Sequence, residues 1–313
     1  MSAAPRAVVF AYHNVGARCL RVLLAHGVDV ALVVSHEDEL NENIWFERVA
    51  ALAHAYDIAV ATPADPGTAE FIGQLQALRP DFFFSFYYRL MLKPALLAIP
   101  TRGAYNMHGS LLPRYRGRVP VNWALIHGEK ETGATLHRMV EKPDAGEIVA
   151  QQAVPILPDD TASEVFNKVT VAAELALDGV LPALLAGRAA HVMPDLAAGS
   201  YFGGRKPEDG RIDWTQPATV VHNLIRAVAP PYPGAFFDLG RHRIVITRSL
   251  SQPGWSGPAG QPQLYTDQAE LFARCADGGV VKILSLELDG EAIAAAALPA
   301  RLGHNPLPLV FPS

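Results

Sequence analysis

The chain has 313 residues, of which 50% are hydrophobic and 18% are charged, and its formal net charge is -5. These values are typical of a globular protein with ample apolar material for a core, and the length predicts about two domains. No block of Lys or Arg stands out, which argues against a nucleic-acid-binding groove because such grooves need clustered cations. A small or nucleotide-linked substrate fits this composition better.

The two cysteines, Cys19 and Cys275, lie far apart and indicate neither a disulfide framework nor a zinc site. The apolar run at residues 7–12 is too short for the core of a signal peptide. No segment approaches the roughly 20 apolar residues that cross a bilayer. We therefore expect a cytoplasmic protein without a membrane partner.

Between residues 7 and 107 the chain alternates short apolar, β-rich runs with stretches of helical spacing. Apolar strands separated by helices indicate a mostly parallel sheet covered on both faces. This is a doubly wound α/β fold, which binds its ligands at the carboxyl ends of the strands. The expected strands are residues 8–12, 28–35, 58–61, 82–86 and 104–108, and the expected helices are residues 15–25, 43–55 and 68–78.

A β-hairpin is predicted next, from residues 133–140 and 147–156, with Asp144 in its loop. A helix should follow it, because Thr161 and Glu164 have the spacing of a capping box and precede an apolar helical face. Gly187 is a suitable stop for this helix. The first domain is accordingly expected to span residues 1–190.

An Ala-, Gly- and Pro-rich stretch, residues 191–209, is expected to connect the two domains. Beyond it, residues 218–228 predict a helix. Strand-like runs follow, separated by turn residues, at positions 235–239, 243–247 and 280–286. They predict a small β-barrel or sheet-rich second domain over residues 210–313.

The most informative residues lie on the strand expected at residues 104–108. Residues two apart on a strand project from the same face, so the amide of Asn106 and the imidazole of His108 should lie side by side. Acyl transfer to an amine needs donors for an oxyanion and groups that take and give protons. Asn106 is always a neutral donor, and His108 titrates near neutral pH. Asp144 would raise the pKa of His108, orient its ring, or receive the amine proton itself.

Each of these residues also has a structural interpretation. A strand-end His often makes only a structural hydrogen bond, Asn106 can satisfy backbone groups, and Asp144 in Asp-Ala-Gly can be an Asx-turn residue. Their shared position, where an α/β sheet binds its ligand, favours a catalytic role. His13 and His36 have no further ligands at metal-binding spacing, so no metal site is predicted.

Longer motifs surround the three polar residues. They are Asn106-Met107-His108-Gly109-Ser110-Leu111-Leu112-Pro113, Asp144-Ala145-Gly146-Glu147-Ile148 and Gly210-Arg211-Ile212-Asp213-Trp214. In these runs, and over nearly its whole length, the chain resembles the folate-dependent formyltransferase family, which includes methionyl-tRNA formyltransferase and the sugar-nucleotide N-formyltransferases. The resemblance implies 10-formyltetrahydrofolate as formyl donor, a Rossmann-like catalytic domain with a mostly parallel sheet, and a smaller C-terminal OB-like β-barrel domain.

Within that family, residues 8–13, 84–89 and 132–140 look most like the formyltransferase half of the bifunctional enzyme that acts on UDP-4-amino-4-deoxy-L-arabinose. No decarboxylase half is present, so a stand-alone form is expected. The resemblance implies a sugar-nucleotide acceptor and a role in lipid A modification. It further implies that Asn106 stabilises the oxyanion, that His108 is the general acid/base, and that Asp144 tunes His108.

The resemblance also implies a folate site formed by residues after the fourth strand, in the loop after the site strand, and in the hairpin loop. These residues are Leu90, Met91 and Leu92, then Arg118, then Val140, Glu141, Lys142 and Pro143. The apolar trio is equally well explained as the first turn of a helix packed on the core, and Arg118 as a solvated surface charge.

Other functions stay open on the sequence alone. A methionyl-tRNA formyltransferase should show a basic RNA-binding surface, whereas residues 205–313 contain ten Lys or Arg and ten Asp or Glu. This balance favours the sugar acceptor. A catalytically inactive folate-binding module would not require an amide, an imidazole and a carboxylate together. A hydrolase that releases formate from the same donor is a further alternative. The oligomeric state is not indicated by any motif.

Overall fold

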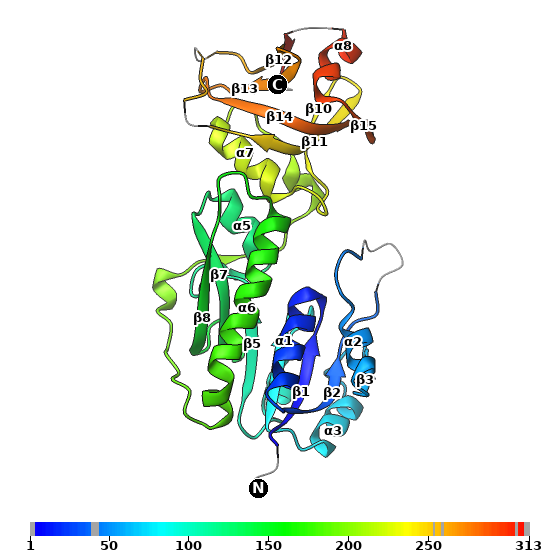
Figure 1. Cartoon of the computed structure of the whole chain (residues 1–313), viewed down its shortest axis with the longest axis vertical. Coiled ribbons are helices and arrows are strands. Elements are labelled where there is room, and N and C mark those ends of the chain that lie inside the picture. Colours follow the sequence, from blue (N-terminus) through cyan, green and yellow to red (C-terminus); the bar gives the residue numbers. More distant parts are fainter. Residues whose placement is uncertain (1–3, 39–43, 253, 258–259, 304–305, 310–313) are drawn as a thin grey trace. The chain divides into compact units, whose positions relative to one another are not determined.

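A computed structural model of the chain (Figure 1) describes residues 4–38, 44–252, 254–257, 260–303 and 306–309. It divides into two compact units that interleave along the sequence. The first consists of Met1–Pro120, Glu131–Val154 and Asn167–Gly203, and the second of Val121–Lys130, Pro155–Phe166 and Gly204–Ser313. Two short segments of the expected first domain therefore group with the C-terminal part of the chain.

The first unit is built on a mixed sheet of seven strands. Its strands are β1 (Arg6–Ala11), β2 (Asp29–Val34), β3 (Val60–Ala61), β4 (Phe82–Phe86), β5 (Ala104–His108), β7 (Glu131–Arg138) and β8 (Ile148–Pro155). Their spatial order is β3-β2-β1-β4-β5-β7-β8. β1 to β5 run parallel to one another, and β7 runs antiparallel to β5. The chain moves outward from β1 in both directions, which confirms the doubly wound arrangement predicted from the sequence.

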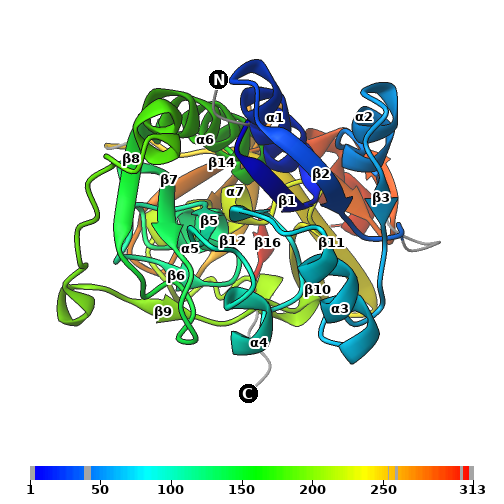
Figure 2. The same cartoon turned by 90° about the horizontal axis from the view of Figure 1, so that it is seen from below.

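Helices cover both faces of this sheet (Figure 2). One face carries α1 (His13–Ala25), α2 (Val49–Ala55) and α6 (Ala162–Leu185), and the other carries α3 (Ala69–Ala77) and α4 (Pro94–Leu97). On the α3 side, Phe71 and Leu75 pack with Val8, Phe10 and Phe83 in a buried cluster. Burial on both faces explains why the central strands are continuous apolar runs.

The helix expected at residues 43–55 is shorter than predicted. α2 begins only at Val49, and residues 44–48 are not helical, while residue 43 lies outside the described part of the chain. The aromatic side chains of this stretch pack against His13 instead of forming a helix face. The ring of Phe46 stacks on His13 with the centroids 4.2 Å apart, and Trp45 meets the same ring edge-on at 4.5 Å.

The capping box that precedes α6 is confirmed. The backbone N–H of Thr161 donates to the Glu164 carboxylate over 2.7 Å, and the N–H of Glu164 donates to the Thr161 hydroxyl over 3.4 Å. The helix ends at Leu185, and Gly187 follows with a left-handed φ of 68°. A glycine tolerates this conformation without steric cost.

The second unit contains a curled antiparallel sheet that forms a half-barrel, as the OB-like prediction required. Its strands are β10 (Ala235–Leu239), β11 (His242–Leu250), β12 (Gln263–Asp267), β13 (Glu270–Arg274), β14 (Val280–Leu288), β15 (Glu291–Ile293) and β16 (Leu307–Pro308). β12, β13, β15 and β16 were not predicted. Helix α7 (Ala218–Ala227) contributes Val221 and Ile225 to a core shared with Ile244 and Ile246 of the sheet. Among the described residues, two further α-helices are α5 (Pro120–Ile126) and α8 (Leu298–Leu302).

The stretch expected to be a connector is not wholly irregular. It contains β9 (Tyr201–Phe202), which pairs in parallel with β6 (Arg116–Gly117). Among the described residues, none of the helices has the length and apolar character needed to cross a membrane.

Candidate active site

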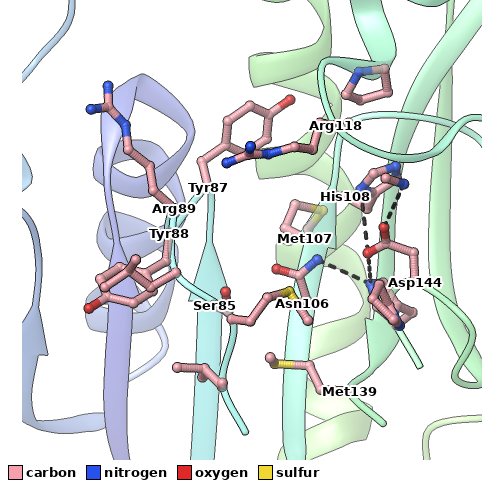
Figure 3. Close-up of a pocket in the computed structure, with 18 of the residues that line it drawn as sticks. Ser85, Tyr87, Tyr88, Arg89, Asn106, Met107, His108, Arg118, Met139 and Asp144 are labelled. Atoms are coloured by element: carbon pink, nitrogen blue, oxygen red, sulfur yellow. Dashed lines mark hydrogen bonds and ion pairs between the residues drawn. The ribbon is translucent and has the colours of Figure 1, made fainter. Parts of the chain in front are cut away.

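A cavity of about 480 Å³ lies at the carboxyl ends of β4 and β5 in the first unit (Figure 3). Open α/β sheets bind their ligands at this edge, and the volume is that of a small-molecule site. The lining has an apolar part formed by Leu90, Met91, Leu92, Met107, Met139 and Val140. It also has a polar part formed by Ser85, Asn106, His108, Arg118, His137 and Asp144.

β5 carries Asn106 and His108 to the cavity. The strand is held on both edges, because Asn106 is the register partner of Ser85 on β4 and of His137 on β7. The loop that follows is fixed by Thr135, the register partner of His108: its hydroxyl donates to the carbonyl of Ser110 over 2.6 Å. The polar end of the cavity thus rests on paired strands.

The tautomer of His108 follows from a backbone contact. Its Nε2 lies 2.7 Å from the carbonyl oxygen of Tyr115, and a carbonyl oxygen only accepts hydrogen bonds. Nε2 therefore carries the hydrogen, and Nδ1 of the neutral ring keeps a lone pair that faces Oδ1 of Asp144 at 3.6 Å. Burial lowers the pKa of His108, and the negative charge of Asp144 opposes this effect. The lowered pKa favours the neutral ring, whose Nδ1 has the lone pair that a proton acceptor needs.

Asp144 lies in the loop between β7 and β8, and its side chain is 13% exposed. The backbone N–H of Gly117 donates to its Oδ2 over 2.9 Å. Burial alone would raise the pKa of Asp144, but His108, His137 and the Gly117 N–H together hold that pKa well below its usual range. Asp144 is therefore a carboxylate beside His108, able to stabilise the protonated ring.

Three residues of the cavity lining have a strained backbone. Tyr87, Val119 and Asp144 all line the cavity, and their φ angles are 58°, 47° and 50°. Positive φ is unusual for a residue with a side chain, and least expected for a β-branched one such as Val119. Gly117 has a φ of 97°, and a Cβ at this position would strike the carbonyl of Phe202. Strained residues of this kind cluster at functional sites.

The apolar trio after β4 is not the first turn of a helix, because α4 begins only at Pro94. Leu92 is buried, with 4% of its surface exposed, whereas Leu90 and Met91 are 38% and 61% exposed at the cavity. The helical interpretation of these three residues is therefore wrong. Two exposed apolar side chains beside a cavity are available to a ligand.

The remaining predicted folate contacts divide into two groups. Arg118, Val140 and Pro143 line the cavity. Glu141 and Lys142 are exposed and do not belong to the lining. Within the described residues, no group of three or more His, Cys, Asp or Glu is arranged to hold a metal ion.

His137 was assigned no role from the sequence, although it lines the cavity and is only 2% exposed. Its Nε2 is 3.1 Å from Nδ2 of Asn106 and 3.5 Å from Oδ1 of Asp144. The hairpin containing His137 was predicted, but its pairing with β5 was not. It is this antiparallel pairing that places His137 opposite Asn106.

Comparison with known proteins bears on this site. The sequence model of the formyl transferase family matches residues 11–181, and that of the formyl transferase C-terminal domain matches residues 205–301. The chain belongs to the formyl transferase family. As a member it is a formyltransferase, which confirms the enzyme class predicted from the motifs.

Solved structures of similar fold include sugar N-formyltransferases. The enzyme from Helicobacter canadensis, in complex with folinic acid and dTDP-3-aminofucose, is 19% identical, with a TM-score of 0.71 over 90% of this chain and 99% of its own. The sugar 3N-formyltransferase WlaRD, with dTDP and 5-N-formyl-THF, is 18% identical, with a TM-score of 0.70 over 90% and 98%. HypX from Aquifex aeolicus is 17% identical, with a TM-score of 0.64 over 95% of this chain and 49% of its own. At sequence identities this low, the similarity to these structures shows only that the fold is shared.

Proposed function

We propose that this formyltransferase moves the formyl group of 10-formyltetrahydrofolate to the amino group of a nucleotide-linked amino sugar. We further propose the 4-amino group of UDP-4-amino-4-deoxy-L-arabinose as the acceptor. The observation that carries the proposal is the grouping of Asn106, His108 and Asp144 at one cavity in a chain of the formyl transferase family. The acceptor class is supported by the solved sugar N-formyltransferases of similar fold. The particular sugar is supported by the resemblance of residues 8–13, 84–89 and 132–140.

The chemistry of such a transfer matches the polar end of the cavity. The acceptor amine attacks the formyl carbon, a C–N bond forms, and the carbonyl electrons move onto the oxygen. An N–H of Asn106 donates to that oxyanion, and Nδ1 of His108 takes the proton that the amine loses. The bond from the formyl carbon to N10 of the folate then breaks, and N10 receives the proton from His108. The products are a formamide and tetrahydrofolate.

Asp144 stabilises the state of the reaction in which His108 is protonated. Once Nδ1 of His108 is protonated, the ring carries a positive charge beside a carboxylate 3.6 Å away. The depressed pKa of Asp144 keeps it ionised throughout, so it stabilises the cation and does not compete for the proton. General acid–base catalysis of this kind contributes about 10²- to 10⁴-fold to a rate.

The rest of the cavity lining, together with Arg118 of its polar part, suits the folate. Leu90, Met91 and Val140 offer apolar surface to a ring system, and Arg118 offers a positive charge to a carboxylate. A nucleotide sugar would approach the same reacting atoms as a separate ligand. We therefore propose a folate and a sugar nucleotide as the small-molecule partners, with neither a nucleic acid nor a membrane involved. The cytoplasmic location stays a prediction.

The direct test is to incubate the enzyme with 10-formyltetrahydrofolate and a panel of UDP- and dTDP-linked amino sugars, and to look for the mass gain of one formyl group. We expect formylation of UDP-4-amino-4-deoxy-L-arabinose and its loss in the His108→Ala variant. Formate release without any acceptor would indicate a hydrolase. Formylation of initiator methionyl-tRNA in place of every sugar would overturn the proposed acceptor.

A further inference from the structure

The buried ring of His137 has no part in the transfer chemistry described above, yet both of its nitrogens are engaged. Its Nδ1 lies 3.0 Å from the carbonyl oxygen of Arg138. Its Nε2 faces Asn106 at 3.1 Å and Asp144 at 3.5 Å. Buried polar groups in such a network rigidify their surroundings when every one of them is satisfied.

The hydrogen positions follow from the chemistry of the partners. A carbonyl oxygen has only lone pairs, so Nδ1 of His137 must donate to Arg138 and carries the ring hydrogen. In the neutral ring Nε2 is then a bare acceptor. Of the two ends of the Asn106 amide, only the NH₂ group can donate to it. A neutral ring with hydrogen on Nδ1 therefore requires the NH₂ end of the amide to face Nε2.

This orientation matters for the reacting atoms. An amide NH₂ group has two hydrogens, and His137 takes one of them. Figure 3 shows the amide nitrogen of Asn106 on the side of Asp144 and His108. The second hydrogen remains for the substrate on this side. A flipped amide would present its oxygen there, and an oxygen repels a developing oxyanion.

We propose that His137, in its neutral Nδ1–H form, is a positioning residue that keeps the free N–H of Asn106 directed at the formyl oxygen of the substrate. This inference rests on the proposed function, because it assigns Asn106 the role of oxyanion donor. His137 itself touches no reacting atom.

Protonation of His137 would reverse the arrangement. Nε2 would become a donor, and the Asp144 carboxylate 3.5 Å away would compete with Asn106 for it. In the described part of the chain His108 also faces this carboxylate, with its Nδ1 3.6 Å from the same oxygen. The side chain of Arg138 points away to Glu147, at 3.7 Å. The accepting state of His137 and its ion pair with Asp144 therefore exclude one another.

The first test uses the unaltered protein and does not depend on activity. Two-bond ¹H–¹⁵N correlation spectra of histidine rings distinguish a nitrogen that carries hydrogen from one that does not. At pH 7.5 we expect hydrogen on Nδ1 of His137 and on Nε2 of His108. Hydrogen on Nε2 of His137 would overturn the inference and leave the proposed function standing.

Two substitutions of His137 distinguish the role of Nε2 from that of Nδ1. His137→Gln places an amide oxygen near the level of Nε2 and can still accept from Asn106, whereas His137→Asn can replace only the Nδ1–H bond to Arg138. Loss of one oxyanion donor costs about 10²- to 10³-fold in kcat. We therefore expect kcat of His137→Asn to fall by about 10²-fold, with the KM values for the folate and for the sugar nucleotide nearly unchanged. His137→Gln should recover most of this loss. His54→Asn, at an exposed position on α2, is the matched control.

A double-mutant cycle decides whether His137 acts through Asn106. If it does, Asn106→Ala combined with His137→Asn should be no slower than Asn106→Ala alone. Multiplied losses would show that His137 acts independently and would overturn the inference, as would wild-type kcat in His137→Asn. If His137→Asn does not fold, the ring spectra of the wild type still decide. Absence of transfer by the wild type to any acceptor would instead defeat the proposed function.

Discussion

His108 is tied to Tyr115 by a hydrogen bond of 2.7 Å from the ring Nε2 to the backbone carbonyl. This bond commits Nε2 to the protein and leaves Nδ1 as the atom that faces Asp144. In the proposed mechanism the fold therefore fixes which nitrogen acts as the base before any substrate binds. A base fixed in this way loses no orientational freedom at the moment of reaction.

The Asp144→Asn variant should shift the pH dependence of catalysis. Asp144 raises the pKa of His108 against the effect of burial, so removal of its charge lowers that pKa further. The acid limb of kcat/KM should therefore move to lower pH. The plateau should fall by about 10²-fold or more, because a weaker base with an unstabilised cation transfers protons less well. Asp57→Asn, an exposed substitution, is the control; an acid limb that stays in place would contradict the assignment.

The stability of the protein should depend on pH through His108. Its folded pKa lies below the ordinary value of 6.5, so the unfolded chain gains a proton first as the pH falls. The contribution of the neutral buried ring is fully present above about pH 6.5 and is lost as the pH falls toward the folded pKa, at no more than about 1.4 kcal/mol per pH unit. Urea unfolding of the wild type and of His108→Gln at pH 7.5 and 5.5 measures this. Identical pH dependence in the two proteins would refute it.

Gly117→Ala should damage both stability and turnover. Its φ of 97° lies in the left-handed region, which costs a residue with a Cβ about 1–2 kcal/mol, and the new methyl would displace the Phe202 carbonyl. The Gly117 N–H that binds Asp144 would move with it. Gly203→Ala meets open space and should change the free energy of unfolding by less than about 0.5 kcal/mol. Thermal melts and kcat for both variants check this contrast; equal effects would argue against it.

The exposed apolar pair Leu90 and Met91 should matter for folate binding and not for chemistry. In the double variant Leu90→Ser/Met91→Ser we expect KM for 10-formyltetrahydrofolate to rise about tenfold, because apolar burial on binding is lost, with kcat nearly unchanged. Leu175→Ser is the matched control, since that residue is 55% exposed on α6 and does not line the cavity. A fall in kcat without a change in KM would place these residues elsewhere in the reaction.

Much of the first unit could be predicted because its signals are local. The strands at residues 82–86 and 104–108 have the predicted bounds, since the first is a largely apolar run preceded by Pro80 and Asp81, and the second lies between Gly103 and Gly109. Asn106 and His108 could be placed together because they share a strand face. Asp144 joined them only through the resemblance and the position of a hairpin loop.

What could not be predicted depends on distant contacts. The pairing of β7 with β5, and hence the place of His137, is set by packing across 31 residues of chain. The apolar pattern at Trp45 and Phe46 suggested a helix because pattern alone does not distinguish a helix face from an aromatic cluster on His13. The weakly alternating strands β12 and β13 have few buried positions, so their sequences carry little strand signal. The predicted bounds of the functional domains stay a prediction.

The contact between Asn106 and His137 depends on the register between β5 and β7. Because side chains alternate along a strand, a one-residue slip would put Leu136 or Arg138 opposite Asn106 in place of His137. A single insertion within β7 is therefore far more harmful than a longer one in a surface loop. Conversely, a change in the chain between the two strands that preserves this alignment also preserves the contact between the amide of Asn106 and the imidazole of His137.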